Sequence, residues 1–307
     1  MRKAVVTGAS GFVGSHLIKE LVNNGVEVFA IIKDERKNID SICFSNVKII
    51  YYNLKDHYNL DEIIIDRDID VFYHLAWAGV SAENKNNFDM QYDNIRLCVN
   101  ALTSAKKINC SLFIGAGTVA EYMYCDKPMN DSFPVSPADA YGAAKASSKL
   151  FCNVMAKQLG QNMIWTILPS VYGEGREGEN ILTYTIRTLL RNDKPSFTKL
   201  EQLWDFLYVG DLAKALYMIG IKGKHGETYG IGSGIFKPMR FYIETIRDII
   251  NKDLPIGIGD IPYLNDRIPS SCVDTSKLST DTGFIPSYTF EQGIKKTIKW
   301  YNNKKYL

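Results

Sequence analysis

The feature that most constrains the fold is a glycine-rich turn that begins at the eighth residue. Three glycines stand at G-x-x-G-x-x-G spacing, after an apolar run at residues 4–7 and before a segment with helical periodicity. Glycines at such a junction permit a tight turn and let backbone N–H groups approach a pyrophosphate, whose charge the helix N-terminus favours. The turn therefore predicts a dinucleotide-binding βαβ unit. The residues expected at the cofactor phosphates are Gly8, Ser10, Gly11, Phe12, Val13 and Gly14.

Strand-like and helix-like segments alternate through the first two-thirds of the chain. Short β-branched runs predict strands, and longer runs with apolar residues three and four positions apart predict helices. The expected strands are 4–7, 26–32, 47–51, 70–75, 111–115 and 163–168, and the expected helices are 12–22, 60–65, 88–107 and 137–159. Strands joined by helices predict an α/β fold, a Rossmann doubly wound parallel sheet with both faces covered.

After Pro169 the pattern loosens, which favours a second and smaller lobe. Helices are expected at 181–191, from 211, at 239–251 and at 290–301, and strands at 206–209 and 226–231. We expect residues 1–175 and about 204–235 to form the dinucleotide-binding Rossmann domain. Residues from about 176 to 203, with 236–307, then form a C-terminal lobe that binds the substrate.

Composition excludes several classes of protein. The 36 Lys and Arg residues against 34 Asp and Glu give a formal charge of +2, whereas a general nucleic-acid binder usually carries a larger, clustered positive excess. No apolar run approaches the roughly 20 residues of a spanning helix, and the N-terminus leads directly into a strand without room for a secretory leader. None of the six cysteines lies in a C-x-x-C pair, so no metal site is expected. We expect a cytoplasmic protein without nucleic-acid or membrane partners.

The end of the second strand indicates which cofactor is bound. An NAD site normally places Asp or Glu there to hold the ribose 2′-hydroxyl, but this strand ends with Ile32 and is followed by Lys33. Lys33 and Arg36 are cationic and suit the 2′-phosphate of NADP. Asp34 lies one residue further along, so NAD(H) stays possible while NADP(H) is favoured.

Tyr141 and Lys145 lie four residues apart in the helix that follows the fifth strand. This spacing places both side chains on one face of a helix. A phenol is a weak acid with a pKa of about 10, and a nearby ammonium stabilises the phenolate and lowers that pKa. Thr118 stands in the glycine-containing turn at the end of the fifth strand. Its hydroxyl would lie at the carboxyl end of the sheet, where such folds bind ligands.

Further motifs accompany these three residues, and together they resemble the extended short-chain dehydrogenases that act on nucleotide sugars. The resemblance runs almost from end to end of the chain. Besides the glycine turn and the Thr-Tyr-Lys set, it rests on residues 74–79, Asn94, residues 169–173, residues 204–211, Arg267, residues 274–278 and residues 283–286. It implies hydride transfer at a sugar carbon, with Tyr141 exchanging the proton and Thr118 bound to the substrate oxygen. Lys145 would support Tyr141 and hold the nicotinamide ribose.

The resemblance also implies the remaining contacts. Besides the glycine turn, Lys33 and Arg36, the cofactor contacts are expected from Asn53, Leu54, Leu75, Ala76, Trp77, Asn94, Tyr141, Lys145, Pro169 and Val171. The nucleotide-sugar contacts are expected from Ala78, Thr118, Val119, Asn180, Leu182 and Arg267. The helix at 88–107 and the helix carrying Tyr141 resemble the pair that forms the dimer interface of this family, which implies a homodimer.

Three functions stay open after this comparison. The 4,6-dehydratases of the family carry an Asp-Glu pair directly after the catalytic Thr, whereas Val119 and Ala120 follow Thr118 here, so a dehydratase is disfavoured. The missing acid after the second strand favours an NADPH-dependent reductase of a nucleotide-linked 4-keto-6-deoxyhexose. The alternative is a 4-epimerase that retains NAD. A non-catalytic NADP-binding sensor is the third possibility, although such proteins usually lose the Tyr or the Lys.

Overall fold

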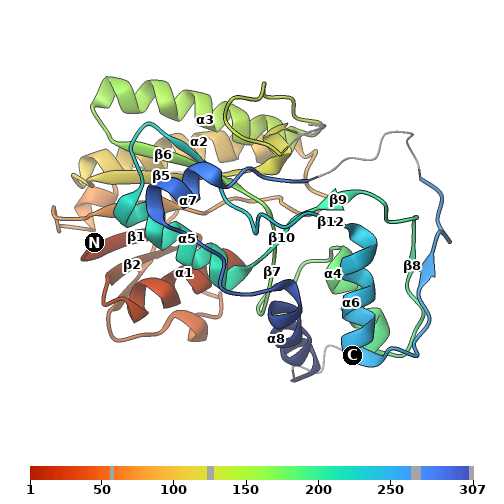
Figure 1. Cartoon of the computed structure of the whole chain (residues 1–307). Helices are drawn as coiled ribbons and strands as arrows, with labels where there is room; N and C mark the ends of the chain where they lie inside the picture. The colour runs from red at the N-terminus through yellow and green to blue at the C-terminus, as the bar shows by residue number, and fades with distance from the viewer. Residues whose placement is uncertain (56–58, 123–127, 264–270, 304–307) are drawn as a thin grey trace.

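Seven parallel strands form the central sheet of the computed structural model, which describes residues 1–55, 59–122, 128–263 and 271–303. Their order is β11-β6-β5-β4-β1-β2-β3 (Figure 1). The strands are β1 (Lys3–Thr7), β2 (Glu27–Ile32), β3 (Val47–Tyr51), β4 (Val71–His74), β5 (Leu112–Thr118), β6 (Met163–Leu168) and β11 (Thr228–Gly230). Connections run outward in both directions from β1 and β4, so the predicted doubly wound parallel sheet is confirmed. The switch point between these two strands is where such sheets bind ligands.

Helices cover both faces of this sheet, as Figure 1 shows. The helices on one face are α1 (Phe12–Asn23) and α5 (Val209–Lys222), and those on the other are α2 (Phe88–Lys107) and α3 (Ala140–Leu159). The apolar strand residues alternate between the two layers, because successive side chains of a strand point to opposite faces. In β1, Ala4 and Val6 pack in the core with Leu17 of α1, whereas Val5 packs in the core with Leu102 of α2.

Helix α3 begins three residues later than the sequence pattern predicts. Its N-cap is Asp139, whose carboxylate accepts a hydrogen bond from the Gly142 backbone N–H at 2.7 Å. A capping carboxylate satisfies a backbone N–H that the first helical turn leaves unpaired. The helix ends at Gly160, which has a left-handed φ of +60°. The Asp139 cap therefore places Tyr141 in the first turn of α3.

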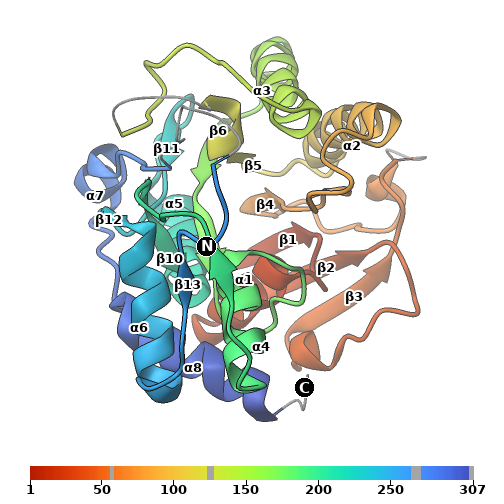
Figure 2. The ribbon, with the colours of Figure 1, turned by 90° about the vertical axis from the view of Figure 1, so that its right-hand side faces the viewer.

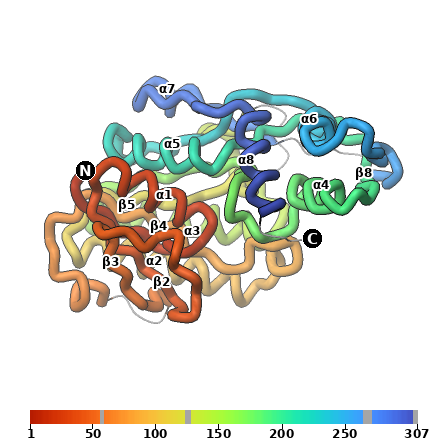
Figure 3. Tube along the Cα trace, turned by 90° about the horizontal axis from the view of Figure 1, so that it is seen from below, coloured from red at the N-terminus to blue at the C-terminus, as the bar shows by residue number. Residues whose placement is uncertain are grey.

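A second group of elements lies beyond one edge of the sheet, on the side that faces the viewer in Figure 2. It contains the helices α4 (Ile181–Leu190), α6 (Met239–Asn251) and α8 (Phe290–Asn303). Its short strand pairs are β7 (Ser170–Tyr172) with β10 (Phe206–Tyr208), β8 (Ser196–Phe197) with β13 (Gly257–Ile258), and β9 (Leu203–Trp204) with β12 (Lys237–Pro238). Figure 3 shows α4 and α6 together at the end opposite β1 to β3. The strand expected at 206–209 therefore pairs outside the main sheet.

An aromatic cluster holds the second group of elements together. The ring of Phe206 lies 4.9 Å from that of Tyr242 on α6, and Tyr242 lies 4.7 Å from Phe290 on α8, between ring centroids. Such edge-to-face pairs stabilise beyond the burial of their area. The sequence did not predict α7 (Ser276–Thr282) or the short strand pairs, and the helix expected at 60–65 is only a 3-10 turn, Leu60–Glu62.

Two absences follow for the part of the chain that is described. None of its helices combines the length and apolar character that crossing a bilayer requires. It holds no cluster of three His, Cys, Asp or Glu side chains that could bind a metal ion. The five described cysteines are free thiols, and four of them are buried.

Candidate active site

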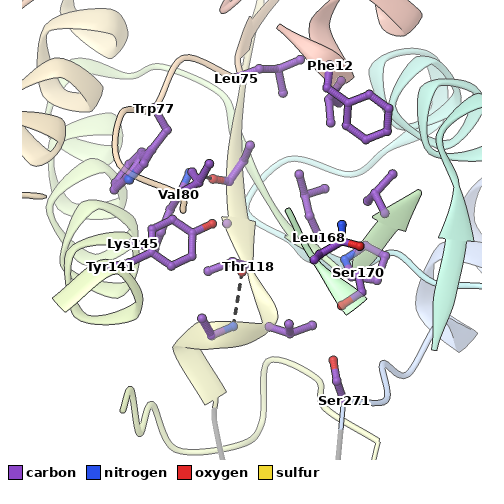
Figure 4. A pocket seen from close by; sticks show the side chains of 18 of the residues that line it. Phe12, Leu75, Trp77, Val80, Thr118, Tyr141, Lys145, Leu168, Ser170 and Ser271 are labelled. Atoms are coloured by element: carbon purple, nitrogen blue, oxygen red, sulfur yellow. Dashed lines mark hydrogen bonds between the residues drawn. The ribbon is translucent and has the colours of Figure 1, made fainter. Parts of the chain in front are cut away.

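A cavity of about 660 Å³ opens at the carboxyl edge of the sheet, the edge at which β1, β4, β5 and β6 end. Its walls come from the glycine turn, from the segments after β4, β5 and β6, and from α3, α4 and β9 to β10. Figure 4 shows side chains from these segments facing one space. Of the predicted site residues, the cavity is lined by Gly8, Gly11, Phe12, Val13, Gly14, Leu75, Trp77, Thr118, Val119, Tyr141, Lys145, Pro169, Val171 and Asn180.

The glycine turn is shaped by main-chain packing. Gly8 has a φ of +67°, and a Cβ there would lie 2.8 Å from the backbone nitrogen of Ala76. A Cβ on Gly14 would lie 2.2 Å from the carbonyl oxygen of Gly8, so no side chain fits at either position. No side chain caps the N-terminus of α1 and no acid lies in its first turn. The first backbone N–H groups of α1 are therefore suited to bind an anion.

Thr7 and His74 hold the segment after β4 against the glycine turn. The Thr7 hydroxyl oxygen accepts hydrogen bonds from the backbone N–H groups of Leu75 and Ala76, each at 3.2 Å. The same hydroxyl shares a hydrogen bond of 2.9 Å with His74 Nδ1. Sequence reasoning did not assign this role to Thr7, and the signal for it is its position at the end of β1.

Asn94 supports the same segment from α2. Its side chain accepts a hydrogen bond from the Ala78 backbone N–H at 3.0 Å and donates one to the Ala78 carbonyl at 2.9 Å. Trp77 donates its indole N–H to Gln91 at 3.0 Å. Asn94, Ala76 and Ala78 do not line the cavity in the described residues. They lie behind the cavity wall, where they hold Leu75 and Trp77 in place.

The three predicted catalytic residues meet at one side of the cavity (Figure 4). The Thr118 side chain faces the Tyr141 phenol and favours its ionised form. The Lys145 ammonium donates to the Ala116 carbonyl at 2.5 Å and lies 3.6 Å from the centroid of the Trp77 ring. Their meeting follows from the i, i+4 spacing on α3 and from the place of Thr118 at the end of β5.

Burial determines the ionisation of the Tyr-Lys pair. It lowers the pKa of Lys145 to about 8, because the low-dielectric surroundings disfavour the ammonium. It raises the pKa of Tyr141 to about 12, and the negative charge of Glu121 acts in the same direction. The lowering of the Tyr141 pKa expected from Lys145 is not found, because the groups that lower it are Thr118 and Arg176, and burial outweighs both. At neutral pH the structure presents a protonated phenol to the cavity.

The charged side chains that line the cavity are all cationic in the described residues: Lys85, Lys145 and Arg176. The Arg176 guanidinium lies 5.5 Å from the ring centroid of Phe12, and burial lowers its pKa. Lys85 pairs with Asp139 at 3.6 Å. A buried cationic site without a lining carboxylate attracts anions such as phosphates. Sequence reasoning missed Arg176 and Lys85, which lie in loops with no distinguishing pattern.

The residues that follow β2 are arranged around an ion pair. Lys33 is exposed, and Arg36 makes two hydrogen bonds of 2.9 Å to the Asp34 carboxylate. Arg36 and Asp34 are the groups that would hold a 2′-phosphate and a 2′-hydroxyl, respectively. In this structure they neutralise each other, so the ion pair does not select between NADP and NAD.

Asn53 and Leu54, the contacts predicted after β3, do not line the cavity in the part of the chain that is described. The Asn53 side-chain oxygen accepts the Lys55 backbone N–H at 3.2 Å. Leu54 is buried, and its carbonyl accepts a hydrogen bond from Asn100 at 2.9 Å. These contacts fix the turn after β3 beside β2, with which β3 pairs.

On the substrate side, Asn180 caps α4. Its side-chain oxygen accepts the backbone N–H groups of Leu182 at 2.9 Å and Thr183 at 3.0 Å. Leu182 is packed in the hydrophobic core and not at the cavity. The predicted contact Arg267 lies outside the described residues.

A model of the NAD dependent epimerase/dehydratase family matches residues 4–232, which is most of the chain. The chain belongs to this family. The resemblance to extended short-chain dehydrogenases that act on nucleotide sugars is thereby confirmed, as is the assignment to an enzyme family that uses NAD(P).

Curated relatives match along nearly the whole chain. The dTDP-glucose 4,6-dehydratase of Escherichia coli is 26% identical, over 97% of this chain and 92% of the relative. The dTDP-4-dehydro-6-deoxyglucose reductase of Escherichia coli is 27% identical, over 96% of each. Among solved structures, UDP-glucuronic acid 4-epimerase from Bacillus cereus, in complex with UDP-glucuronic acid and NAD, has a TM-score of 0.87 and 24% identity. The match covers 98% of this chain and 99% of the epimerase chain. The relatives thus include three reaction types.

The buried ammonium generates a prediction about stability. Its pKa of about 8 in the folded state lies below its usual 10.5, so the unfolded chain binds more protons between these values. The folded protein therefore gains stability as pH rises from 8 to 10.5, by about 2–3 kcal/mol from this group. Lys145→Met abolishes that gain. Denaturant unfolding at several pH values measures it, and Lys299→Met, which removes an exposed ammonium, should keep the gain.

Proposed function

We propose that the protein is an NADPH-dependent reductase that converts a nucleotide-linked 4-keto-6-deoxyhexose to the 4-hydroxy sugar. The observation that carries the proposal is a protonated Tyr141 that faces Thr118 in a cationic cavity beside the glycine turn. The cations match the phosphates of both a dinucleotide and a nucleotide sugar.

The chain's residues divide the reaction between them. The reduced nicotinamide, when bound, would supply the hydride for the carbonyl carbon, so negative charge would develop on the carbonyl oxygen. Tyr141 donates its phenolic proton to that oxygen, and the Thr118 hydroxyl donates a hydrogen bond to it. A phenol whose pKa is about 12 is held as an acid at neutral pH, which favours the reductive direction. Lys145 would stabilise the resulting phenolate and hold the nicotinamide ribose.

Apart from Tyr141 and the lining cations, the described part of this cavity has no acid or base that could catalyse a dehydration. Loss of water from a sugar needs one group to remove a carbon-bound proton and another to protonate the leaving hydroxyl. Val119 and Ala120 line the cavity directly after Thr118, whereas Glu121 is buried behind them. This lining therefore favours the reaction of the reductase relative over that of the dehydratase relative.

Two other functions are kept as alternatives. A 4-epimerase would hold NAD and return the hydride to the opposite face of the sugar, and the epimerase structure of the same fold supports that reading. A non-catalytic NADP-binding sensor is disfavoured, because Thr118, Tyr141 and Lys145 are all present and lie together. Release or retention of oxidised cofactor separates the reductase from the epimerase.

The division of labour between the two parts of the chain belongs to the proposal. Residues 1–175 with about 204–235 would bind the cofactor, and about 176–203 with 236–307 would bind the nucleotide sugar. Asn180 and Arg176 lie where these two parts meet at the cavity. We assign Arg176 and Lys85 to phosphate binding, because among the described lining residues they and Lys145 carry the positive charge.

We also propose a homodimer that pairs α2 and α3 with the same helices of a second copy. Large apolar side chains are exposed on these helices, namely Phe88, Tyr92, Leu150, Phe151 and Val154. Exposed apolar side chains gathered on one face are typical of an interface between proteins. Light scattering should give twice the monomer mass, and Phe151→Asp should lower it to the monomer value. A wild-type monomer contradicts this assembly.

The function itself is tested with NADPH and a panel of nucleotide-linked 4-keto-6-deoxyhexoses. We expect loss of the NADPH absorbance in a 1:1 ratio with one of these sugars, which also identifies the nucleotide. Absorbance that stays constant while a 4-hydroxy nucleotide sugar is inverted would establish the epimerase in place of the reductase.

Tyr141→Phe removes the proton donor and keeps the ring that packs against Trp77. We expect its turnover to fall by at least about two to three orders of magnitude, as the loss of a general acid implies. Cofactor affinity, measured by fluorescence titration, should stay near that of the parent. Turnover retained in this variant would rule out Tyr141 as the acid.

We assign the preference for NADPH to Lys33 and to Arg36, which would exchange the Asp34 carboxylate for the 2′-phosphate. Replacing both by Ala should raise the KM for NADPH about tenfold or more and leave the KM for NADH within about twofold, because the lost charges face only a 2′-phosphate. Lys37→Ala is the matched control, since it removes a neighbouring exposed charge. Equal losses for both cofactors would contradict the assignment.

A further inference from the structure

A buried carboxyl group lies directly behind Thr118. Glu121, in the 3-10 helix η3 (Val119–Tyr122), is fully buried and does not line the cavity. Its Oε1 accepts the Thr118 backbone N–H at 2.8 Å and the Trp165 indole N–H at 3.3 Å. Its Oε2 accepts no hydrogen bond from the described residues. Burial of a carboxyl with an unused acceptor is unfavourable, so its presence requires a reason.

The surrounding sequence makes room for this carboxyl. Trp165 of β6 lies across β5, where a Cβ on Gly115 would lie 2.4 Å from its ring carbons. A Cβ on Gly117 would lie 2.2 Å from Trp165 Nε1 and 2.4 Å from Glu121 Oε1. Both glycines are therefore required by the Trp165–Glu121 pair. The pair in turn fixes the backbone from which Thr118 reaches the cavity.

Among the described residues, the charged groups that face Glu121 come from α3. Its carboxylate interacts with the ammonium groups of Lys145 and Lys149, and its charge acts on the Tyr141 phenol. The strands β5 and β6 that pack against it contain no ionisable residue. The groups that act in turn on these three residues are Asp139 and Arg176 at Tyr141, Cys98 at Lys145, and Asp131, Lys277 and Tyr122 at Lys149.

We propose that Glu121 is a positioning residue, whose carboxyl holds Thr118 in place beside Tyr141 and whose charge biases the protonation of Tyr141 and Lys145. The inference rests on the catalytic roles proposed above. Burial raises the pKa of Glu121 to about 7, so its charge changes close to neutral pH. Once ionised, it disfavours the Tyr141 phenolate and favours the Lys145 ammonium, and both pKa values rise. Tyr141 is thereby kept as a proton donor.

The first experiment follows the Lys145 side chain by NMR in ¹³C-lysine-labelled protein without ligand. The Lys145 signal is identified by its absence from Lys145→Met. Glu121→Gln keeps the shape and an accepting oxygen but removes the charge, so the titration midpoint of Lys145 should fall by about one pH unit. An unchanged midpoint overturns the inference. Because no substrate is needed, that outcome is distinct from a failure of the proposed reductase.

Asp205→Asn is the matched control. Asp205 is also fully buried, with its pKa raised to about 6 by burial, but it accepts its hydrogen bonds from Ser233 and Gly234. This variant should leave the Lys145 midpoint unchanged. A shift as large as that of Glu121→Gln would assign the effect to general loss of buried charge and overturn the inference.

Turnover gives a second readout that a merely structural role would not move. In the direction of sugar oxidation, where Tyr141 accepts a proton, the rise of kcat with pH should begin about one unit lower in Glu121→Gln. Glu121→Ala should lose about 10–100-fold in kcat with KM within about twofold, as expected for a residue that orients a catalytic group. If that variant does not fold, Trp165→Phe removes one donor and should lose a smaller factor. Equal losses in stability and KM, without a shifted pH profile, would show a structural role only.

Discussion

The parallel alignment of β1, β4, β5 and β6 is the constraint on which the rest of the structure depends. Since all four strands end at one edge, the segments that follow them must share the space beyond that edge. The glycine turn, the Trp77 segment, Thr118 and the Pro169 segment consequently surround one cavity. Helix α3 adds Tyr141 and Lys145 because its first turn starts at the Asp139 cap beside that edge.

Low dielectric surroundings then decide what this cavity can do. Burial shifts the pKa of Lys145 downward and that of Tyr141 upward, so each group is drawn toward its uncharged form. The carboxylate of Glu121 opposes this effect at Lys145 and adds to it at Tyr141. The cavity is lined by cations, and the Glu121 carboxylate does not reach it. The site is therefore suited to phosphorylated ligands and to proton donation.

The parts that could be predicted from sequence are those set by local geometry. The glycine turn, the ends of α2 and α6 and the Tyr141–Lys145 spacing each depend on a few consecutive residues. Other parts depend on contacts between distant segments. Glu121 is three residues from Thr118, but its inward direction requires Trp165 and the glycines that admit that ring. Arg176 follows β7, which pairs with β10. The sequence predicts the strand at 206–209 but not its pairing with β7.

The close approach of Gly8 to Ala76 determines when the glycine turn can form during synthesis and folding. β1 is synthesised before β2 and β4, but it pairs with both of them. The glycine turn that follows β1 packs against the main chain that follows β4. The cofactor cradle cannot exist until that later strand has been synthesised and has inserted beside β1. A nascent chain that ends before β4 carries the whole glycine motif and no binding site. Dinucleotide binding thus requires β1, β2 and β4 to be assembled, and its onset would mark the moment at which β4 has inserted beside β1.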